Sequence, residues 1–145
     1  MSLELKFDPK TIEHLGVKMY ATLPPALAEL ISNAYDADSA NVVVEFTEVN
    51  KVPKGIVVKD EGEGMSLDDI QTKFLVIGRN RRNEGDKPSK KFKRLPTGKK
   101  GLGKLALFGL ANEIVVDTIK NGLRNRLRLN WNDLLSSSSI YSPKI

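Results

Sequence analysis

The chain has 145 residues, of which 40% are hydrophobic and 28% are charged, and its formal net charge is +5. A chain of this length holds one domain with a modest core. The absence of cysteine excludes disulfides and thiolate metal sites, and the single histidine argues against a zinc site. No apolar run approaches the roughly 18 residues of a membrane helix, so we expect a cytoplasmic protein with no membrane partner.

The first four predicted elements are two helices and two strands, in chain order at residues 8–20, 23–38, 41–49 and 55–60. The first helix begins at Asp8 and Pro9, which suit the N-cap and the first turn. The second helix begins near Pro24 and carries apolar residues at helical spacing. The two strands are rich in β-branched residues, and we expect a turn at Pro53 and Gly55 between them.

The later predicted elements are a helix, a long loop, another helix and a pair of strands, at residues 65–78, 78–100, 102–111 and 113–131. Ser66 is suited to cap the first of these helices. Asn121-Gly122 is a strong two-residue hairpin signal inside the strand pair. Residues 136–145 show no clear structural pattern. Because the strands are joined partly by hairpins, the sequence predicts an α/β fold other than a doubly wound parallel sheet.

Positive charge is concentrated in residues 79–104, which hold eleven Lys or Arg residues against two acidic ones, a local net charge of +9. Two interpretations stay open for this segment. It is a solvated mobile loop, or it contacts phosphates of a nucleotide or of a nucleic acid. Phe92 is the lone aromatic residue in the segment, which argues against a surface on which bases stack.

The first of three motifs consists of Glu29, Asn33 and Asp36 in the predicted helix at 23–38. Offsets of four and three place these side chains on one helical stripe, beside apolar neighbours. The stripe is either the polar flank of an amphipathic helix or a group aimed into a cavity. In the second case a carboxylate can polarise water, and an amide oxygen can bind Mg²⁺.

The second motif is "VVKDEGEGM", residues 57–65, in which Asp60 ends an apolar strand. Asp60 can accept a hydrogen bond from the exocyclic amine of a flat heterocycle, and Gly62 and Gly64 let the backbone approach the ring. A tight acidic turn without a ligand explains the same residues.

The third motif is the glycine-rich stretch 98–104. Gly98 and Lys104 bound the pattern G-x-x-x-x-G-K, but Leu105 stands where a P-loop needs Ser or Thr, and no buried strand precedes the loop. Backbone N–H groups where the loop enters the predicted helix can still bind phosphate. The sequence therefore favours a phosphate loop of another kind.

These motifs, read as "ELISNAYDAD", "DEGEGM" and "TGKKGLGKLALF" in this order, resemble the three sequence boxes of the GHKL ATPase superfamily. That superfamily includes gyrase B subunits, heat-shock chaperones of the ninety-kilodalton class, sensor histidine kinases, MutL proteins and Morc ATPases. The resemblance covers roughly residues 8–120. It implies a two-layer α/β sandwich of the Bergerat type, with a mixed, mostly antiparallel sheet and helices on one face.

The resemblance also implies roles for single residues. Glu29 would be the general base, and Asn33 would be the ligand of Mg²⁺. Asp60 would select adenine. The residues expected to bind the nucleotide and its metal ion are Asn33, Asp36, Asp60, Gly62, Gly64, Met65, Gly98, Gly101, Gly103 and Lys104. Sensor kinases of this superfamily typically have no glutamate at the position of Glu29, which favours hydrolysis, and His14 lies in no phosphoacceptor hairpin.

The resemblance implies an ATPase module spanning residues 1–135, with a lid at 78–103 that closes on ATP, a tail or truncation point at 136–145, and homodimerisation on ATP binding. We see no strand after 113–131 with the threonine box that many relatives use, and no second domain that would supply a lysine. Turnover is therefore expected to be weak in this chain. The alternative is a nucleic-acid-binding module that uses residues 79–104, with a regulatory or weakly active nucleotide site.

Overall fold

The computed structural model describes residues 3–6, 23–76, 87–97, 107, 111–137 and 140–144. Its helical segments are α3 (Leu23–Asp36), α4 (Leu67–Asp69), the π-helical turn η2 (Ile70–Phe74) and α6 (Trp131–Ser136). Its strands are β1 (Leu5–Lys6), β2 (Val42–Val49), β3 (Val52–Asp60), β4 (Glu113–Lys120), β5 (Leu123–Asn130) and β6 (Ile140–Tyr141). In the described residues the strands form three antiparallel pairs, β1 with β6, β2 with β3 and β4 with β5.

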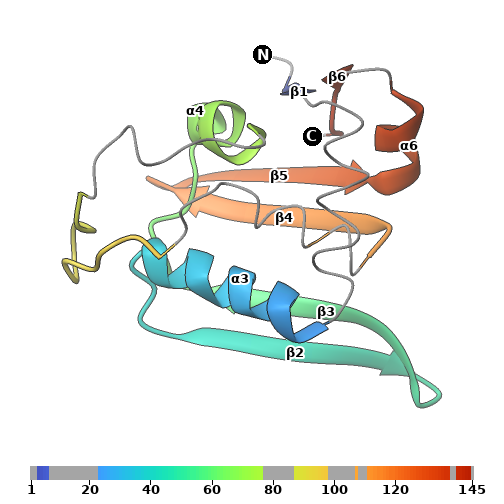
Figure 1. Ribbon diagram of the computed structural model, residues 1–145, viewed down its shortest axis with the longest axis horizontal. Helices are drawn as coiled ribbons and strands as arrows, with labels where there is room; N and C mark the ends of the chain where they lie inside the picture. Colours follow the sequence, from blue (N-terminus) through green and yellow to red (C-terminus); the bar gives the residue numbers. More distant parts are fainter. Residues whose placement is uncertain are drawn as a thin grey trace.

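Helix α3 lies along the β2–β3 pair, and the β4–β5 pair runs beside it (Figure 1). The α/β class is therefore confirmed, as are the helix predicted at 23–38 and both predicted strand pairs. A single mixed sheet in a two-layer sandwich stays a prediction, because the described strands are joined only in pairs. The helix predicted at 8–20 lies outside the described residues. Of the helix predicted at 102–111, the structure describes only Leu107, which is helical, and Ala111, which is not.

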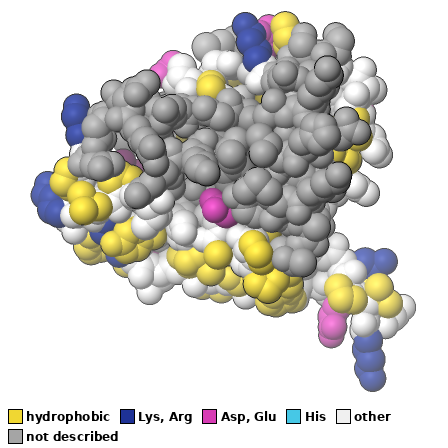
Figure 2. All heavy atoms as spheres, viewed as in Figure 1, with side chains coloured by type: hydrophobic (Ala, Val, Ile, Leu, Met, Phe, Trp, Pro, Cys, Tyr) yellow, Lys and Arg dark blue, Asp and Glu magenta, His cyan; other side chains and the backbone are white. Residues whose placement is uncertain are grey.

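The turn between β2 and β3 differs from the prediction. Asn50 and Lys51 form it, with φ angles of 52° and 63°, whereas Pro53 and Gly55 lie within β3. A two-residue turn with both φ angles positive matches the right-handed twist of paired strands, and asparagine tolerates such angles. Pro53 is compatible with a strand that has a partner on one side. This turn projects from the body of the molecule (Figure 2).

The main core lies on the inner face of the β4–β5 pair. Alternating residues of both strands point inward, which matches the period of two in their sequences. α4, η2, α6 and the β1–β6 pair cover this face. The buried hydrophobic residues of the cluster are Leu3, Leu5, Ile70, Leu75, Ile114, Leu127, Leu129, Leu134 and Tyr141.

The C-terminal segment is more ordered than its sequence predicts. β6 pairs with β1, Lys144 bridges to Arg128, and the hydroxyl of Tyr141 accepts a hydrogen bond from the N–H of Asn130 at 3.0 Å. The sequence misses this because a two-residue strand has no periodicity, and only tertiary contacts bury Tyr141. Residues 140–144 therefore contact β1 and β5 in the described structure.

The short α4 helix is fixed by a polar cluster. Ser66 and Asp69 form a reciprocal capping box, which confirms Ser66 as the predicted N-cap. Lys120 of β4 donates to the Asp69 carboxylate at 2.6 Å, and Lys73 pairs with the same group. The Lys120 and Lys73 ammonium groups hold the pKa of this buried carboxyl well below its ordinary value. The cluster ties the segment after the second motif to β4.

Candidate functional site

The first motif lies on α3, where its side chains flank the buried face of the helix. Ala26 and Ala34 are buried against the strands. Asn33 is exposed, and Glu29 and Asp36 are partly exposed, on one stripe beside this buried face. The structure thus keeps the two carboxylates and the amide accessible along one side of a helix that is itself held by packing.

The second motif turns back onto the C-terminal end of this helix. Asp60 ends β3, and one of its carboxylate oxygens accepts the N–H of Gly62 at 2.8 Å. The next residue, Glu63, donates its N–H to the carbonyl of Ala37 at 2.8 Å. A side-chain carbon on Gly62 would lie only 2.8 Å from both Cβ and the carbonyl oxygen of Ala37. A glycine is therefore required for this contact, which brings Asp60 to the end of α3.

The same loop is fixed on its other side by β4. Gly64 has a φ of 66°, and a side chain on it would overlap the carbonyl of Ile119. The N–H of Met65 donates to Thr118 Oγ1 at 2.9 Å, and the Met65 carbonyl accepts from Asn125 at 3.3 Å. Gly64 is thus required by both its backbone angle and its close approach to β4. Met65 is partly buried and packs against the main core.

The third motif itself lies outside the described residues, so the positions of Gly98, Gly101, Gly103 and Lys104 are not part of the structure described. The residue before it is described. Thr97 donates both its backbone N–H and its hydroxyl to the same carboxylate oxygen of Asp36, each at 2.8 Å. Thr97, from which the chain continues into the glycine-rich stretch, therefore lies beside the C-terminal end of α3.

Segments far apart in the sequence thus converge on one place. The loop after β3 and the residue that precedes Gly98 both contact the end of α3, at Ala37 and Asp36 respectively. Carboxylate and amide oxygens are available there on two elements, together with a loop shaped by two glycines. Such a set can bind a flat polar ring and the oxygens of a hydrated divalent cation.

Sequence reasoning missed several residues of this region, namely Asp38, Arg94, Thr97 and Thr118. For Thr118 a signal existed, because it occupies an inward-facing register position of β4 after Ile114 and Val116. A polar residue at such a position predicts a buried hydrogen-bond partner. The predicted absence of a threonine box concerned a strand after 113–131, whereas Thr118 lies within that strand pair. Arg94 carries no signal of its own inside a run of cations.

In the part of the chain that the structure describes, no helix is both long enough and apolar enough to cross a membrane. The same part of the chain contains no cluster of three or more His, Cys, Asp or Glu side chains able to hold a metal ion.

Comparison with known proteins gives the class to which the chain belongs. The sequence model of the family described as "Histidine kinase-, DNA gyrase B-, and HSP90-like ATPase" matches residues 20–145. The chain therefore belongs to this family, the GHKL ATPases, and the resemblance drawn from the three motifs is confirmed.

One relative from Herpetosiphon aurantiacus is named "Putative type II restriction enzyme HgiDII". The chain is 33% identical to it over 144 residues, which is 97% of this chain. The match spans 22% of the relative's length, so the chain corresponds to a small part of that protein.

Proposed function

We propose that this chain binds ATP together with Mg²⁺ and hydrolyses it to ADP and phosphate. The observation that carries the proposal is that the second motif and Thr97, the residue before the third motif, both contact the C-terminal end of α3, which bears the first motif. Asp36 accepts from Thr97 at 2.8 Å, and Ala37 accepts from Glu63 at 2.8 Å. Membership of the GHKL ATPase family supports the same function.

In this proposal Asp60 recognises the adenine. One of its oxygens is already fixed by Gly62, so the carboxylate has a set orientation, and its other oxygen can accept from the exocyclic amine. The carboxylate would repel the carbonyl that guanine has in place of this amine. Gly64 and Met65 form the loop on which the ring would lie. Asp60 therefore supplies the selectivity for the base.

The proposed chemistry at the phosphates belongs to α3. Glu29 would accept a proton from the attacking water, and the amide oxygen of Asn33, one turn later, would hold Mg²⁺. The donor set fits this ion, because Mg²⁺ usually takes few protein ligands and keeps several waters and phosphate oxygens. When bound, the ion offsets the charge that develops on the phosphates.

The glycine-rich loop after Thr97 would bind the phosphates through its backbone N–H groups, with Gly98, Gly101, Gly103 and Lys104 as contacts. We propose that the segment 78–103 closes over the nucleotide and that closure is linked to homodimerisation. Residues 1–135 are the proposed extent of the nucleotide-binding unit. The contacts of residues 140–144 with β1 and β5 would stabilise this unit from outside it.

The test is titration calorimetry with a non-hydrolysable ATP analogue in the presence of Mg²⁺. We expect one site per chain, and weaker binding when Mg²⁺ is chelated. The matching titration with the GTP analogue is expected to give much weaker binding. A chain that takes up no ATP analogue with Mg²⁺ present would rule out the proposed function.

A second candidate function is nucleic-acid binding by the basic segment. Lysines gather on the described part of this segment and are exposed at Lys87, Lys90, Lys91 and Lys93. Figure 2 shows Lys and Arg side chains beside hydrophobic ones at the edge where Figure 1 places this segment. The name of the relative, a restriction enzyme, agrees with a role on DNA. Both functions can reside in one protein.

Duplex DNA binding followed by fluorescence anisotropy would test this second function. If lysines of this segment contact phosphates, affinity falls steeply with salt, and Lys91→Gln reduces the slope of log K against log salt by about one. Binding that is absent at low salt, or a slope that Lys91→Gln leaves unchanged, would count against this surface.

A further inference from the structure

Asp38 lies just beyond α3, and its backbone has a conformation that residues other than glycine rarely adopt. Its φ angle is 61°, and it is 4% exposed. Its carboxylate accepts the backbone N–H groups of Lys91 and Phe92 at 2.8 and 3.3 Å. Aspartate is among the few residues that tolerate such a φ angle. The buried carboxylate of Asp38 is thus directed at the main chain of the basic segment, and the left-handed backbone of the residue sets this direction.

The charge of Asp38 is maintained by these donors. Burial alone would raise the pKa of this carboxyl. Hydrogen bonds from the Ser89 side chain and from the two backbone N–H groups, with the nearby charge of Arg94, outweigh burial and lower the pKa. The group is therefore ionised at neutral pH, which strengthens its hydrogen bonds to the segment.

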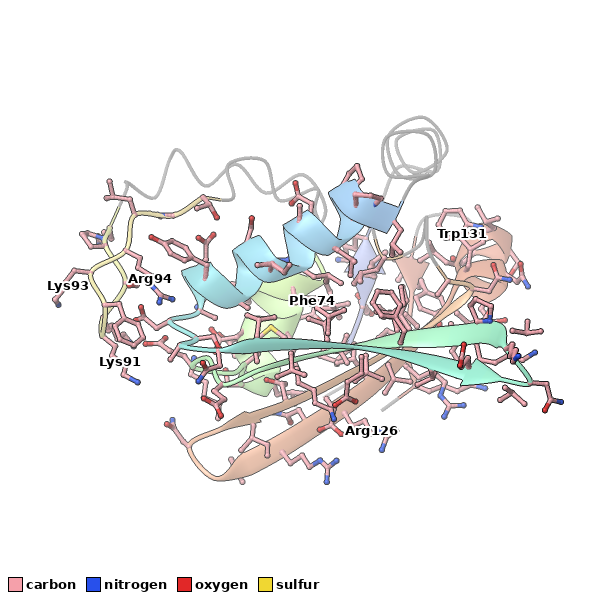
Figure 3. All side chains as sticks on the ribbon, turned by 90° about the horizontal axis from the view of Figure 1, so that it is seen from below. Phe74, Lys91, Lys93, Arg94, Arg126 and Trp131 are labelled. Atoms are coloured by element: carbon pink, nitrogen blue, oxygen red, sulfur yellow. The ribbon has the colours of Figure 1, made fainter. Side chains whose placement is uncertain are left out.

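Arg94 makes the reciprocal contact, from the basic segment back to α3. Its guanidinium donates to the carbonyls of Tyr35 and Ser39 at 3.2 and 2.7 Å. The guanidinium carbon also lies 4.4 Å from the ring centroids of both Tyr35 and Phe92. Figure 3 shows Arg94 directed toward the end of α3, whereas Lys93 points away from it. Carbonyls at a helix end are suitable acceptors for such a cation.

The turn that makes these two contacts is also stabilised by two hydrogen bonds between its own ends. The N–H of Ser89 donates to the carbonyl of Arg94 at 2.8 Å, and the N–H of Arg94 donates to Ser89 Oγ at 2.9 Å. Residues 89–94 therefore form a compact turn, which Asp38 holds at its middle and which the contacts of Arg94 hold at its end. Three residues further on, Thr97 makes its two hydrogen bonds to Asp36.

We propose that Asp38 and Arg94 are positioning residues that anchor segment 87–97 on the end of α3 and thereby hold Thr97 against Asp36 at the proposed nucleotide site. The inference rests on the proposed function. It makes one part of that proposal more specific, because residues 87–97 of the predicted lid are then held against the end of α3.

The test compares Arg94→Lys and Asp38→Asn with the wild type, and Lys93→Gln is the matched control. Lysine keeps the charge of Arg94 but cannot bond two carbonyls and stack between two rings. Asparagine tolerates the φ angle of Asp38 but has one oxygen acceptor and no charge. Lys93→Gln removes a cation from the same turn at a side chain that points away from α3.

Two quantities are measured for each variant. Hydrogen exchange of the Lys91 and Phe92 amides, followed by NMR without nucleotide, reports the anchor itself. Calorimetry with the ATP analogue and Mg²⁺ reports the site. For Arg94→Lys and Asp38→Asn we expect exchange to accelerate and analogue affinity to fall, each by about tenfold, because a charge-assisted hydrogen bond is lost. Lys93→Gln should change neither quantity, and thermal unfolding confirms that each variant is folded.

The outcomes separate the anchor from the proposed function. Unchanged exchange in both Arg94→Lys and Asp38→Asn would overturn the anchor. Faster exchange with unchanged analogue affinity would overturn the role of the anchor at the nucleotide site. A wild type that binds no analogue would overturn the proposed function and the positioning role with it, while the exchange rates would still decide whether the anchor exists.

Discussion

Replacement of Glu29 by glutamine is expected to leave ATP binding intact and to lower the rate of ATP hydrolysis about a hundredfold or more. Glutamine keeps the size and the hydrogen-bonding reach of glutamate but cannot accept the proton of the attacking water. General-base catalysis typically contributes two to four orders of magnitude. Steady-state phosphate release gives the rate, and calorimetry with the non-hydrolysable analogue gives the affinity.

Glu48→Gln is the matched control for this experiment. Glu48 is an exposed glutamate near the far end of β2, beside the projecting turn, and its replacement should leave both the rate and the affinity unchanged. If Glu29→Gln hydrolyses ATP as fast as the wild type, Glu29 is not the base. A loss of analogue binding in Glu29→Gln would instead assign this residue to the binding of the nucleotide.

Asp60→Asn is expected to weaken ATP-analogue binding by about tenfold or more and to reduce the preference for ATP over GTP. The amide oxygen can still accept from Gly62, so the loop keeps its shape. The amide nitrogen, however, would face the exocyclic amine of adenine, which leaves a donor opposite a donor. The same nitrogen can donate to the carbonyl of guanine. Calorimetric titrations with both analogues measure the ratio.

Glu61→Gln serves as the control for Asp60→Asn, because it removes a carboxylate from the adjacent residue. Glu61 is exposed, and its side chain lies 3.4 Å from the amide nitrogen of Asn41. Its replacement should leave the ATP-to-GTP ratio as in the wild type. A ratio that Asp60→Asn leaves unchanged would show that Asp60 does not read the base, whatever happens to the overall affinity.

Regular elements with a strong local pattern were predictable. The spacing of apolar residues in α3 and the alternation in β4 and β5 come from the periods of helix and strand, which neighbouring residues express without tertiary contacts. Asn121-Gly122 was identified correctly as a turn, and both residues have positive φ angles. The turn at Asn50-Lys51 was not predicted, because Pro53 and Gly55 are stronger turn signals. Both residues are also compatible with a strand that has a partner on one side.

The chemistry of the site was predictable only as a list of residue types. Glu29, Asn33 and Asp60 were identified because polar groups at the margin of an apolar helix or strand need a reason to be there. What they do remains a proposal. The resemblance of the chain to one superfamily followed from the order of the three motifs, and the family match confirms this resemblance.

By itself, therefore, the sequence determined the α/β class, the main helix and the hairpins, since each depends on local spacing. It also indicated the residues that we propose bind a nucleotide. The tertiary structure decided how these parts meet. Gly62 against Ala37, Thr97 against Asp36, and the contacts of Asp38 and Arg94 join residues more than twenty positions apart. Charge and composition describe residues 79–104 only as a basic run. The contacts of Arg94 with the carbonyls of Tyr35 and Ser39 and with the ring of Tyr35 show that part of this run lies against the end of α3.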